Sequence, residues 1–320
     1  MMSSPSLEAL EAAAGFVYQA VSPTPQICWP LLCARTGAQV WVKHENHTGV
    51  GAFKLRGGLV YIHEMKERYP EAAGVVAATR GNHGQSIACA AARAGLRAVI
   101  VVPRGNSREK NAAMQALGAI LIEHGEDFQA AYEYAACLAE QEGLHLARSF
   151  DESLVSGVAS YALELFRGVS DLDAVYVPIG MGSGICGLIA ARNALGLNTE
   201  LIGVVAARAP AYALSFAAKR PISAPVEPTI ADGMACRVPD GAALEMILGG
   251  ASRILTVTDE EIEAAMRFLF SDTHNVAEGA GAAALAGLLQ EQQRMKGKRV
   301  ALILSGANVD RDVFARVLGG

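Results

Sequence analysis

The chain has 320 residues, a formal net charge of −5, 52% hydrophobic residues and 18% charged residues. This composition favours a folded chain with a large core over a disordered one. The small negative charge, without a long run of like charges, argues against a nucleic acid or an anionic membrane as the main partner.

Targeting signals and cysteine usage indicate the compartment. The most apolar stretches are far shorter than the roughly 18–20 residues that a membrane-spanning helix needs. The N-terminal segment carries Glu8 and Glu11 and no preceding Lys or Arg, unlike a secretory signal. The six cysteines are scattered without a CxxC pair, which is typical of reduced thiols. We therefore expect a cytoplasmic protein whose partner is a small molecule, with no nucleic acid and no membrane bound.

Short apolar runs alternate with segments of helical periodicity along most of the chain. In chain order, the predicted strands are Gln39–Val42, Gly74–Ala78, Ala98–Val102, Ile120–Ile122, Ala174–Pro178, Leu201–Val205 and Val300–Leu304. The predicted helices are Gln85–Ala94, Ser107–Leu117, Phe128–Glu142, Ser153–Phe166, Ile185–Asn193 and Asp259–Phe270. This alternation predicts an α/β fold whose mostly parallel strands are covered on both faces.

One segment breaks the alternation. Residues Lys219–Val238 contain Pro221, Pro225 and Pro228. Proline at this density predicts an irregular segment, which is either a surface loop or a wall of the binding site.

Ligands of α/β folds bind where strands are followed by helices, and four such loops carry unusual residues. The first loop, GAFKLRGG at 51–58, places Lys54 among apolar residues and glycines. Burial there lowers the pKa of an amine and makes it a nucleophile or a Schiff-base former. The alternative is a solvated lysine at the start of a helix, with its stem over apolar surface.

The other three loops offer groups that recognise anions and rings. The loop TRGNHGQS at 79–86 follows a strand and opens a helix, so its N–H groups suit a carboxylate, unless it is an ordinary helix cap. The glycine-rich loop at 177–187 suits a phosphate, or is a tight turn. Ser305 offers a hydroxyl to a ring nitrogen, or caps the next turn. Pyridoxal 5′-phosphate (PLP), which combines a phosphate with amine-reactive chemistry, fits all four loops together.

Six motifs now carry a resemblance to a known family. GAFKLRGG, TRGNHGQS, GMGSG, TIADGMA, AEGAGAAAL and LSGANVD follow one another between about Thr24 and Asp310. In this order they resemble the fold-type II PLP enzymes, and most of all the threonine/serine dehydratase and serine racemase branch. The resemblance implies two open, mostly parallel twisted sheets flanked by helices, as in the tryptophan synthase β-subunit. It also implies a large PLP-binding domain (1–71 plus 149–320), a small mobile domain (72–148) and a homodimer.

The resemblance assigns roles to particular residues. Lys54 would form the Schiff base with the cofactor and remove the α-proton of the substrate as general base. The ring of the cofactor and its substituents would contact Phe53, Asn82, Glu278 and Ser305. The phosphate would be held by Gly180, Met181, Gly182, Ser183 and Gly184. The substrate would be bound by Thr79, Arg80, Gly81, Asn82 and His83.

The implied activity is that of an ammonia-lyase, or dehydratase, which eliminates water from a β-hydroxy-α-amino acid and gives a 2-keto acid and ammonia. Threonine or serine is the default substrate, and phenylserine fits as well. The alternatives are a 3-hydroxyaspartate dehydratase and a β-replacement enzyme or racemase of the same fold. A non-catalytic binding protein is a further alternative, although such a protein has no need to retain Lys54.

Arg80 bears on the choice among these substrates. Racemases of the branch carry a serine there as the second acid/base, and arginine cannot act as a base because its pKa exceeds about 12. An inward Arg80 would bind a second acidic group, as in 3-hydroxyaspartate, or stack on the ring of phenylserine, whereas an outward Arg80 would be structural. Some relatives bind a divalent cation after the strand that ends near Val205, but Ala206–Tyr212 contains no acid, so we expect no metal site. His44, Glu45 and His47 are expected to be structural.

Overall fold

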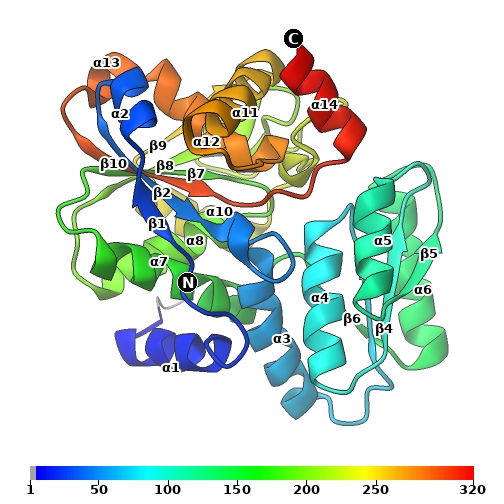
Figure 1. Ribbon diagram of the computed structural model, residues 1–320. Coiled ribbons are helices and arrows are strands. Elements are labelled where there is room, and N and C mark those ends of the chain that lie inside the picture. Colours follow the sequence, from blue (N-terminus) through cyan, green and yellow to red (C-terminus); the bar gives the residue numbers. More distant parts are fainter. Residues whose placement is uncertain (1–4) are drawn as a thin grey trace.

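The computed structural model describes residues 5–320 (Figure 1). The strands are β1 (Gln26–Cys28), β2 (Gln39–His44), β3 (Val75–Ala78), β4 (Ala98–Val102), β5 (Ile120–Glu123), β6 (His145–Leu146), β7 (Ala174–Pro178), β8 (Glu200–Ala206), β9 (Arg253–Val257) and β10 (Arg299–Leu304). The helices are α1 (Leu7–Val17), α2 (Pro30–Thr36), α3 (Lys54–Arg68), α4 (Asn82–Arg93), α5 (Arg108–Ala116), α6 (Phe128–Glu142), α7 (Glu152–Gly168), α8 (Ser183–Ala194), α9 (Ala211–Ala218), α10 (Gly241–Gly250), α11 (Asp259–Thr273), α12 (Gly279–Gln290), α13 (Gln292–Met295) and α14 (Arg311–Gly319). Two short 3₁₀ turns, η1 (Glu45–His47) and η2 (Asp232–Met234), complete these elements.

The strands form two separate sheets, which confirms the predicted fold class. A six-stranded sheet has the order β1-β2-β10-β7-β8-β9, and a four-stranded sheet has the order β5-β4-β3-β6. Every strand pair is parallel except β1 with β2. The elements from β3 to β6 form a smaller part beside the larger one, and they are joined to it through α3 and α7 (Figure 1).

Helices cover both faces of the larger sheet. Along β7, Val175 and Val177 belong to one hydrophobic cluster with α7, α8 and α10, whereas Ala174 and Tyr176 belong to another with α11 and α12. Successive side chains of a strand point to opposite faces, so the two clusters lie on opposite sides of the sheet. This double covering explains why the central strands read as continuous apolar runs.

The four-stranded sheet is built in the same way. Its β3 and β4 are buried at every residue, with α3 and α4 packed on one face and α6 on the other. The sheet runs from Val75 to Leu146 and so falls inside the segment 72–148. The division of the chain into a large domain and a small mobile domain stays a prediction.

Differences from the predicted elements have physical reasons. The predicted strands and helices are all present, with their ends shifted by up to three residues or, for β4, β7 and α6, not at all. The sequence does not predict β1, β6 and β9, because these strands have only two to five residues and are partly exposed. They therefore lack the long apolar run by which the other strands are recognised. Helix α12 was missed because it is apolar on all sides and has no amphipathic period.

The expectation of a loop over 51–58 is wrong beyond Phe53, because α3 begins at Lys54. Gly57 and Gly58 lie inside this helix, where glycine has an unfavourable propensity. A Cβ at Gly57 would come within 2.7 Å of the Leu154 carbonyl oxygen, and one at Gly58 would collide with the Ser86 hydroxyl. These glycines therefore serve the close packing of α3 against α7 and α4.

Within residues 5–320, no helix combines the length and the apolar composition that crossing a bilayer demands.

Candidate active site

A cavity lies where the carboxyl ends of strands from both sheets approach each other. Its atom-free volume is about 1070 Å³, including the open mouth. The cavity brings together every predicted site residue: Phe53, Lys54, Thr79, Arg80, Gly81, Asn82, His83, Gly180, Met181, Gly182, Ser183, Gly184, Glu278 and Ser305. This placement matches the expectation that ligands of α/β folds bind at the carboxyl ends of the strands. The role of each residue stays a prediction.

Lys54 is held at the end of β10 by backbone contacts. The N–H of Phe53 donates to the Ser305 carbonyl at 3.0 Å, and Ala52 forms an isolated antiparallel bridge with Gly306. The amine of Lys54 lies 4.7 Å from the centroid of the Phe53 ring. Burial lowers the pKa of Lys54 to about 8, although Glu278 opposes the shift. A lysine with a lowered pKa can react with a carbonyl carbon near neutral pH.

The glycine-rich loop connects β7 to the first turn of α8. Gly182 has a φ of +104°, in the left-handed region, and a Cβ there would come within 2.9 Å of the Ala243 Cβ. A Cβ at Gly180 would collide with the carbonyl oxygen of Gly233. The loop therefore needs glycine for both its backbone conformation and its close contacts. The N–H groups at the start of α8 face no helical acceptor, so the loop fits a phosphate.

A second helix start, that of α4, carries the predicted substrate loop. The Thr79 hydroxyl accepts from the Gly81 N–H at 3.0 Å, and α4 begins at Asn82. His83 is buried, and its Nε2 has no hydrogen-bond partner among the described residues. Burial lowers the pKa of His83 to about 3, so its ring is neutral near pH 7. A buried ring nitrogen without a partner on the cavity wall is an observation that fits a polar ligand.

Glu278 stands at the centre of a polar network that joins the two sheets. The Asn82 side-chain amide donates to Glu278 Oε1 at 2.5 Å and accepts from the Asn308 amide at 2.8 Å. Lys110, on α5, donates to Asp232 at 2.7 Å and lies 3.4 Å from Glu278 Oε2. Burial raises the pKa of Glu278, and the nearby Lys110 opposes the shift.

Lys110 responds in the opposite sense to Lys54. Burial lowers the pKa of Lys110, but Glu278 and Asp232 outweigh this, and its pKa lies above the ordinary value. The two carboxylates thus keep Lys110 protonated and bound in ion pairs, whereas Lys54 loses its proton more readily. The pKa values of the two lysines shift in opposite directions because, among residues 5–320, Lys110 has carboxylates within 4 Å and Lys54 has none.

Several cavity residues were not predicted. Lys110, Phe128, Ser149 and Asp232 line the cavity together with Ala78, Pro178, Gly233, Met234, Ala235 and Ala280. Nothing in the sequence marks Lys110 as different from other lysines near helix starts. The residues from Asp232 to Ala235 belong to the proline-rich segment Lys219–Val238, so its role as a wall of the site, one of the two alternatives, is confirmed.

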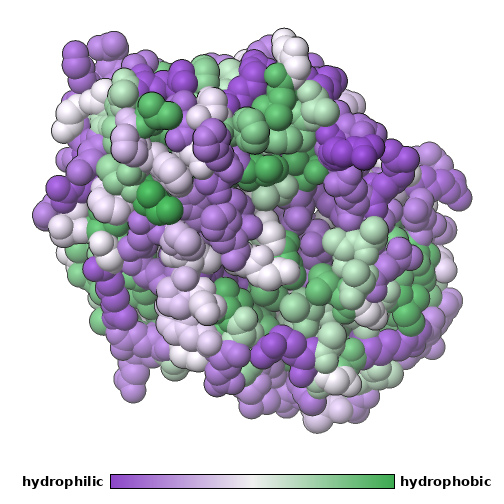
Figure 2. All heavy atoms as spheres, viewed as in Figure 1, coloured by the Kyte–Doolittle hydropathy of each residue, from purple (hydrophilic) through white to green (hydrophobic). Residues whose placement is uncertain are grey.

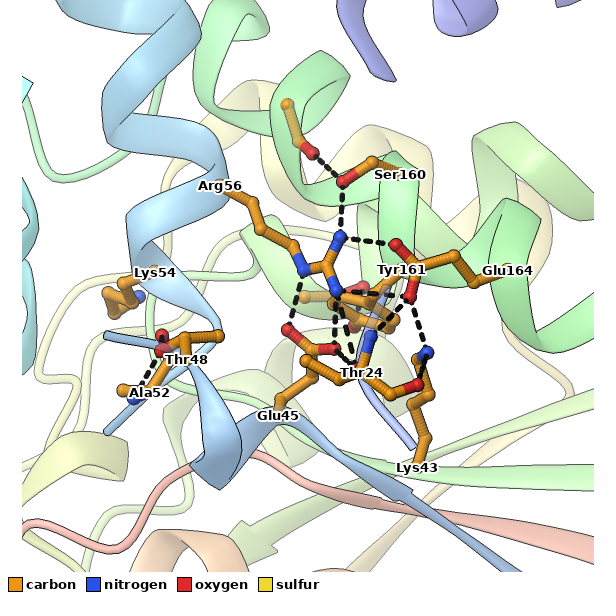
Figure 3. A network of polar contacts seen from close by, with 12 residues as sticks. Thr24, Lys43, Glu45, Thr48, Ala52, Lys54, Arg56, Ser160, Tyr161 and Glu164 are labelled. Atoms are coloured by element: carbon orange, nitrogen blue, oxygen red, sulfur yellow. Dashed lines mark hydrogen bonds and ion pairs between the residues drawn. The ribbon is translucent and has the colours of Figure 1, made fainter. Parts of the chain in front are cut away.

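Behind Lys54, a buried ionic network ties α3 to the larger sheet (Figure 3). The Arg56 guanidinium donates to Glu45 at 2.7 Å and to Glu164 at 2.6 Å, and Lys43 donates to Glu164 at 2.5 Å. The side chains of Arg56 and Glu45 have no exposed surface. In Figure 3, Lys54 and Arg56 leave the first turn of α3 in different directions. Glu45 is therefore a structural ion-pair residue.

A desolvated lysine, a glycine cradle for a phosphate and a hydroxyl at a strand end together define an enzyme that uses a phosphate-bearing carbonyl cofactor. The comparisons with known proteins agree. The model of the family described as "Pyridoxal-phosphate dependent enzyme" matches residues 17–306, and the chain belongs to this family. Its cofactor is pyridoxal 5′-phosphate, and the resemblance seen in the motifs is confirmed.

Individual relatives cover almost the whole chain. An L-threonine ammonia-lyase of Thermotoga maritima is 33% identical over 314 residues, which are 98% of this chain and 78% of the relative. An L-threo-3-hydroxyaspartate ammonia-lyase of a Pseudomonas species is 33% identical over 315 residues, 98% of this chain and 97% of the relative. Among solved structures, maize serine racemase superposes with a TM-score of 0.92 at 25% identity, covering 99% of this chain and 98% of the racemase.

Proposed function

We propose that this PLP-dependent lyase is an ammonia-lyase for acidic β-hydroxy-α-amino acids, with 3-hydroxyaspartate as its substrate. In the proposed reaction the Cα–H and Cβ–O bonds break, and one water molecule leaves. A second water molecule then hydrolyses the dehydrated product, so that the net products are a 2-keto acid and ammonia. The ammonia-lyases among the relatives support this class of reaction.

The residues of the cavity suit the individual steps. Bound PLP supplies the carbonyl group that captures the substrate amine and the ring that accepts electrons from Cα. Lys54 lines the cavity and would hold the cofactor through its amine, and its Nζ would take the Cα proton of the substrate. Phe53, Asn82, Glu278 and Ser305 would orient the ring of the cofactor, and the loop Gly180–Gly184 would bind its phosphate. The start of α4, with Thr79, Gly81, Asn82 and His83, binds the α-carboxylate.

The choice of substrate rests on Arg80 and its lack of a partner among the described residues of the cavity. It lines the cavity and is exposed, and no hydrogen bond or ion pair to it is present among residues 5–320. By contrast, Lys110, another positively charged residue of the cavity lining, is already paired with Asp232 and Glu278. The Arg80 guanidinium is thus free to bind a carboxylate on Cβ, through two parallel hydrogen bonds.

Phenylserine is the second candidate, because an aromatic residue lines the cavity. Phe128, the first residue of α6, is 37% exposed and belongs to the lining. Phe128 and Arg80 both line the cavity, so a phenyl group on Cβ has an aromatic ring and a guanidinium to pack against.

The test is 2-keto acid release by the PLP-loaded protein from 3-hydroxyaspartate, phenylserine, threonine and serine. We expect the highest kcat/KM for 3-hydroxyaspartate. Arg80→Ala should reduce that value at least tenfold and leave the value for threonine nearly unchanged, because threonine lacks the second carboxylate. Arg104→Ala, which removes an exposed arginine paired with Glu126, is the matched control.

Two results would contradict the proposal. A preference for phenylserine, with a loss on Phe128→Ala, would favour the second candidate. A preference for threonine that Arg80→Ala does not alter would exclude a role of Arg80 in selecting the substrate.

We further propose that the protein is a cytoplasmic homodimer in which the segment 72–148 moves as a small domain. The scattered cysteines support the compartment, and the polar contacts between the two sheets support the motion. Light scattering from the purified protein tests the dimer. Hydrogen exchange with and without substrate tests whether 72–148 is protected as a unit.

A further inference from the structure

Two buried tyrosines contact the glycine-rich loop without lining the cavity. Tyr212, on α9, is 1% exposed, and Tyr161, on α7, has no exposed surface. The Tyr212 hydroxyl donates to the Met181 carbonyl at 2.9 Å, and the Tyr161 hydroxyl donates to the Gly184 carbonyl at 3.0 Å. Both hydroxyls therefore act on the backbone of the loop that forms the phosphate cradle.

The Tyr212 hydroxyl also connects the loop to α10. It accepts from the Asp240 N–H at 3.2 Å, and the Asp240 carboxylate caps α10 by accepting from two N–H groups. Ala243, in the first turn of α10, is the residue whose Cβ limits Gly182. One hydroxyl thus sets the distance between the loop and the helix start that packs against it.

The two carbonyls differ in how much they depend on tyrosine. The first helical bond of α8 runs from the Cys186 N–H to the Gly182 carbonyl, so Met181 lies before the helix and its carbonyl has no helical donor. The Gly184 carbonyl lies inside α8, where the helical pattern supplies a donor. Loss of the Tyr212 hydroxyl would leave two backbone groups of half-buried residues without this partner, the Met181 carbonyl and the Asp240 N–H.

An anion site made of backbone N–H groups works only if those groups point inward, which turns the neighbouring carbonyls away from the anion. Such carbonyls need donors of their own, since a buried carbonyl without a donor is costly. Tyr212 and Tyr161 are such donors. Their rings are fixed by burial, and Tyr161 also meets the Phe53 ring edge-on at 6.1 Å.

We propose that Tyr212, supported by Tyr161, is a positioning residue that holds the loop Gly180–Gly184 in its phosphate-binding conformation. This inference rests on the proposed role of that loop and concerns cofactor affinity rather than the choice of substrate. Its effect must depend on the phosphate group of the cofactor, because the two hydroxyls act only through the loop.

The test compares two cofactors, PLP and pyridoxal, which lacks the phosphate. Each is titrated into the cofactor-free protein, and the visible absorbance of the lysine-bound form reports the dissociation constant. Tyr212→Phe should weaken PLP binding about tenfold and leave pyridoxal binding within about twofold of the unaltered protein. Tyr161→Phe should weaken PLP binding by less, about threefold, because the Gly184 carbonyl keeps its helical donor.

Tyr176→Phe is the matched control. Tyr176 is equally buried, and its hydroxyl donates to Glu291 at 2.7 Å, away from the cavity lining. This variant should change the affinity for neither cofactor. It separates the loss of any buried tyrosine hydroxyl from the loss of one that contacts the loop.

Unchanged PLP affinity in Tyr212→Phe would overturn the proposal, and so would equal losses for PLP and pyridoxal, which indicate a general structural role. If Tyr212→Phe does not fold, Tyr161→Phe decides by the same comparison of the two cofactors. The readout does not involve substrate. The two proposals can therefore fail separately. If 3-hydroxyaspartate is not a substrate but Tyr212→Phe weakens the binding of PLP and not of pyridoxal, the proposed substrate is refuted and this inference stands.

Discussion

The two sides of the cavity are held in different ways. On the side of the six-stranded sheet, the lysine helix α3 is fixed by Arg56 and Glu45, whose side chains have no exposed surface (Figure 3). On the other side, α5 meets α14 through polar residues such as Arg108 and Asp312, which are 89% and 65% exposed. Figure 2 shows hydrophilic residues gathered where these two helices approach each other.

This difference bears on which parts can move. Breaking a buried ion pair leaves a charge without compensation in a medium of low polarity, whereas exposed charges exchange their partner for water at little cost. We therefore expect the side of the cavity that carries Lys54 to be rigid, and we expect the contacts of the substrate loop with the larger part to open and close. Lys110 is the intermediate case, since it is buried yet crosses from one part to the other.

The largest effect is expected on the buried side. Arg56→Met should lower the free energy of unfolding by about 3–5 kcal/mol, because Glu45 and Glu164 would remain buried without their guanidinium. Urea unfolding of the PLP-loaded protein measures this. A loss below about 1 kcal/mol would show that the network is no more important than a surface pair.

A smaller effect is expected where Lys110 crosses the cavity. Lys110→Met leaves Asp232 and Glu278 without their cation and should raise the substrate KM about tenfold, by weakening the closed arrangement of the cavity. PLP affinity should change less than KM, because Glu278 is the one proposed cofactor contact that pairs with Lys110 and the phosphate loop is untouched. Steady-state kinetics and cofactor titration give both values, and the reverse pattern would assign Lys110 to the cofactor.

The pH dependence of PLP uptake compares the two lysines of the cavity. Uptake requires the unprotonated amine, and burial lowers the pKa of Lys54 to about 8, so the rate for the cofactor-free protein should rise about fivefold between pH 7 and 8. Between that pKa and the unfolded value the unfolded chain binds more protons, so this shift makes stability rise with pH there. A rate that rises only above about pH 10 would mean that Lys54 is not desolvated.

The smallest effect is expected at the exposed contact. Arg108→Ala removes a side chain that is 89% exposed and 3.6 Å from Asp312, and should change the free energy of unfolding by less than about 0.5 kcal/mol. Urea unfolding measured beside Arg56→Met gives the contrast directly. Equal losses of stability in the two variants would contradict the expected difference between a rigid side and a mobile side.

Much of the site could be predicted from the sequence because its motifs are local. Lys54, the loop 79–83, the loop 180–184 and Ser305 each follow or precede an apolar strand, and parallel strands bring their carboxyl ends to one edge. Their convergence on one cavity is what the structure adds. Lys110 and Asp232 could not be predicted, because their meeting depends on how two separate sheets are placed against each other.

The sequence by itself determined the α/β class, the family, the cofactor and the identity of most cavity residues, because strand runs and short motifs depend on neighbouring residues. The tertiary structure alone decided the charge states and partners of those residues. Lys54 has a lowered pKa and Lys110 a raised one because of burial and carboxylates contributed by distant parts of the chain. It also decided that Arg80 lies on the cavity wall and that buried tyrosines contact the glycine loop, because long-range packing sets both.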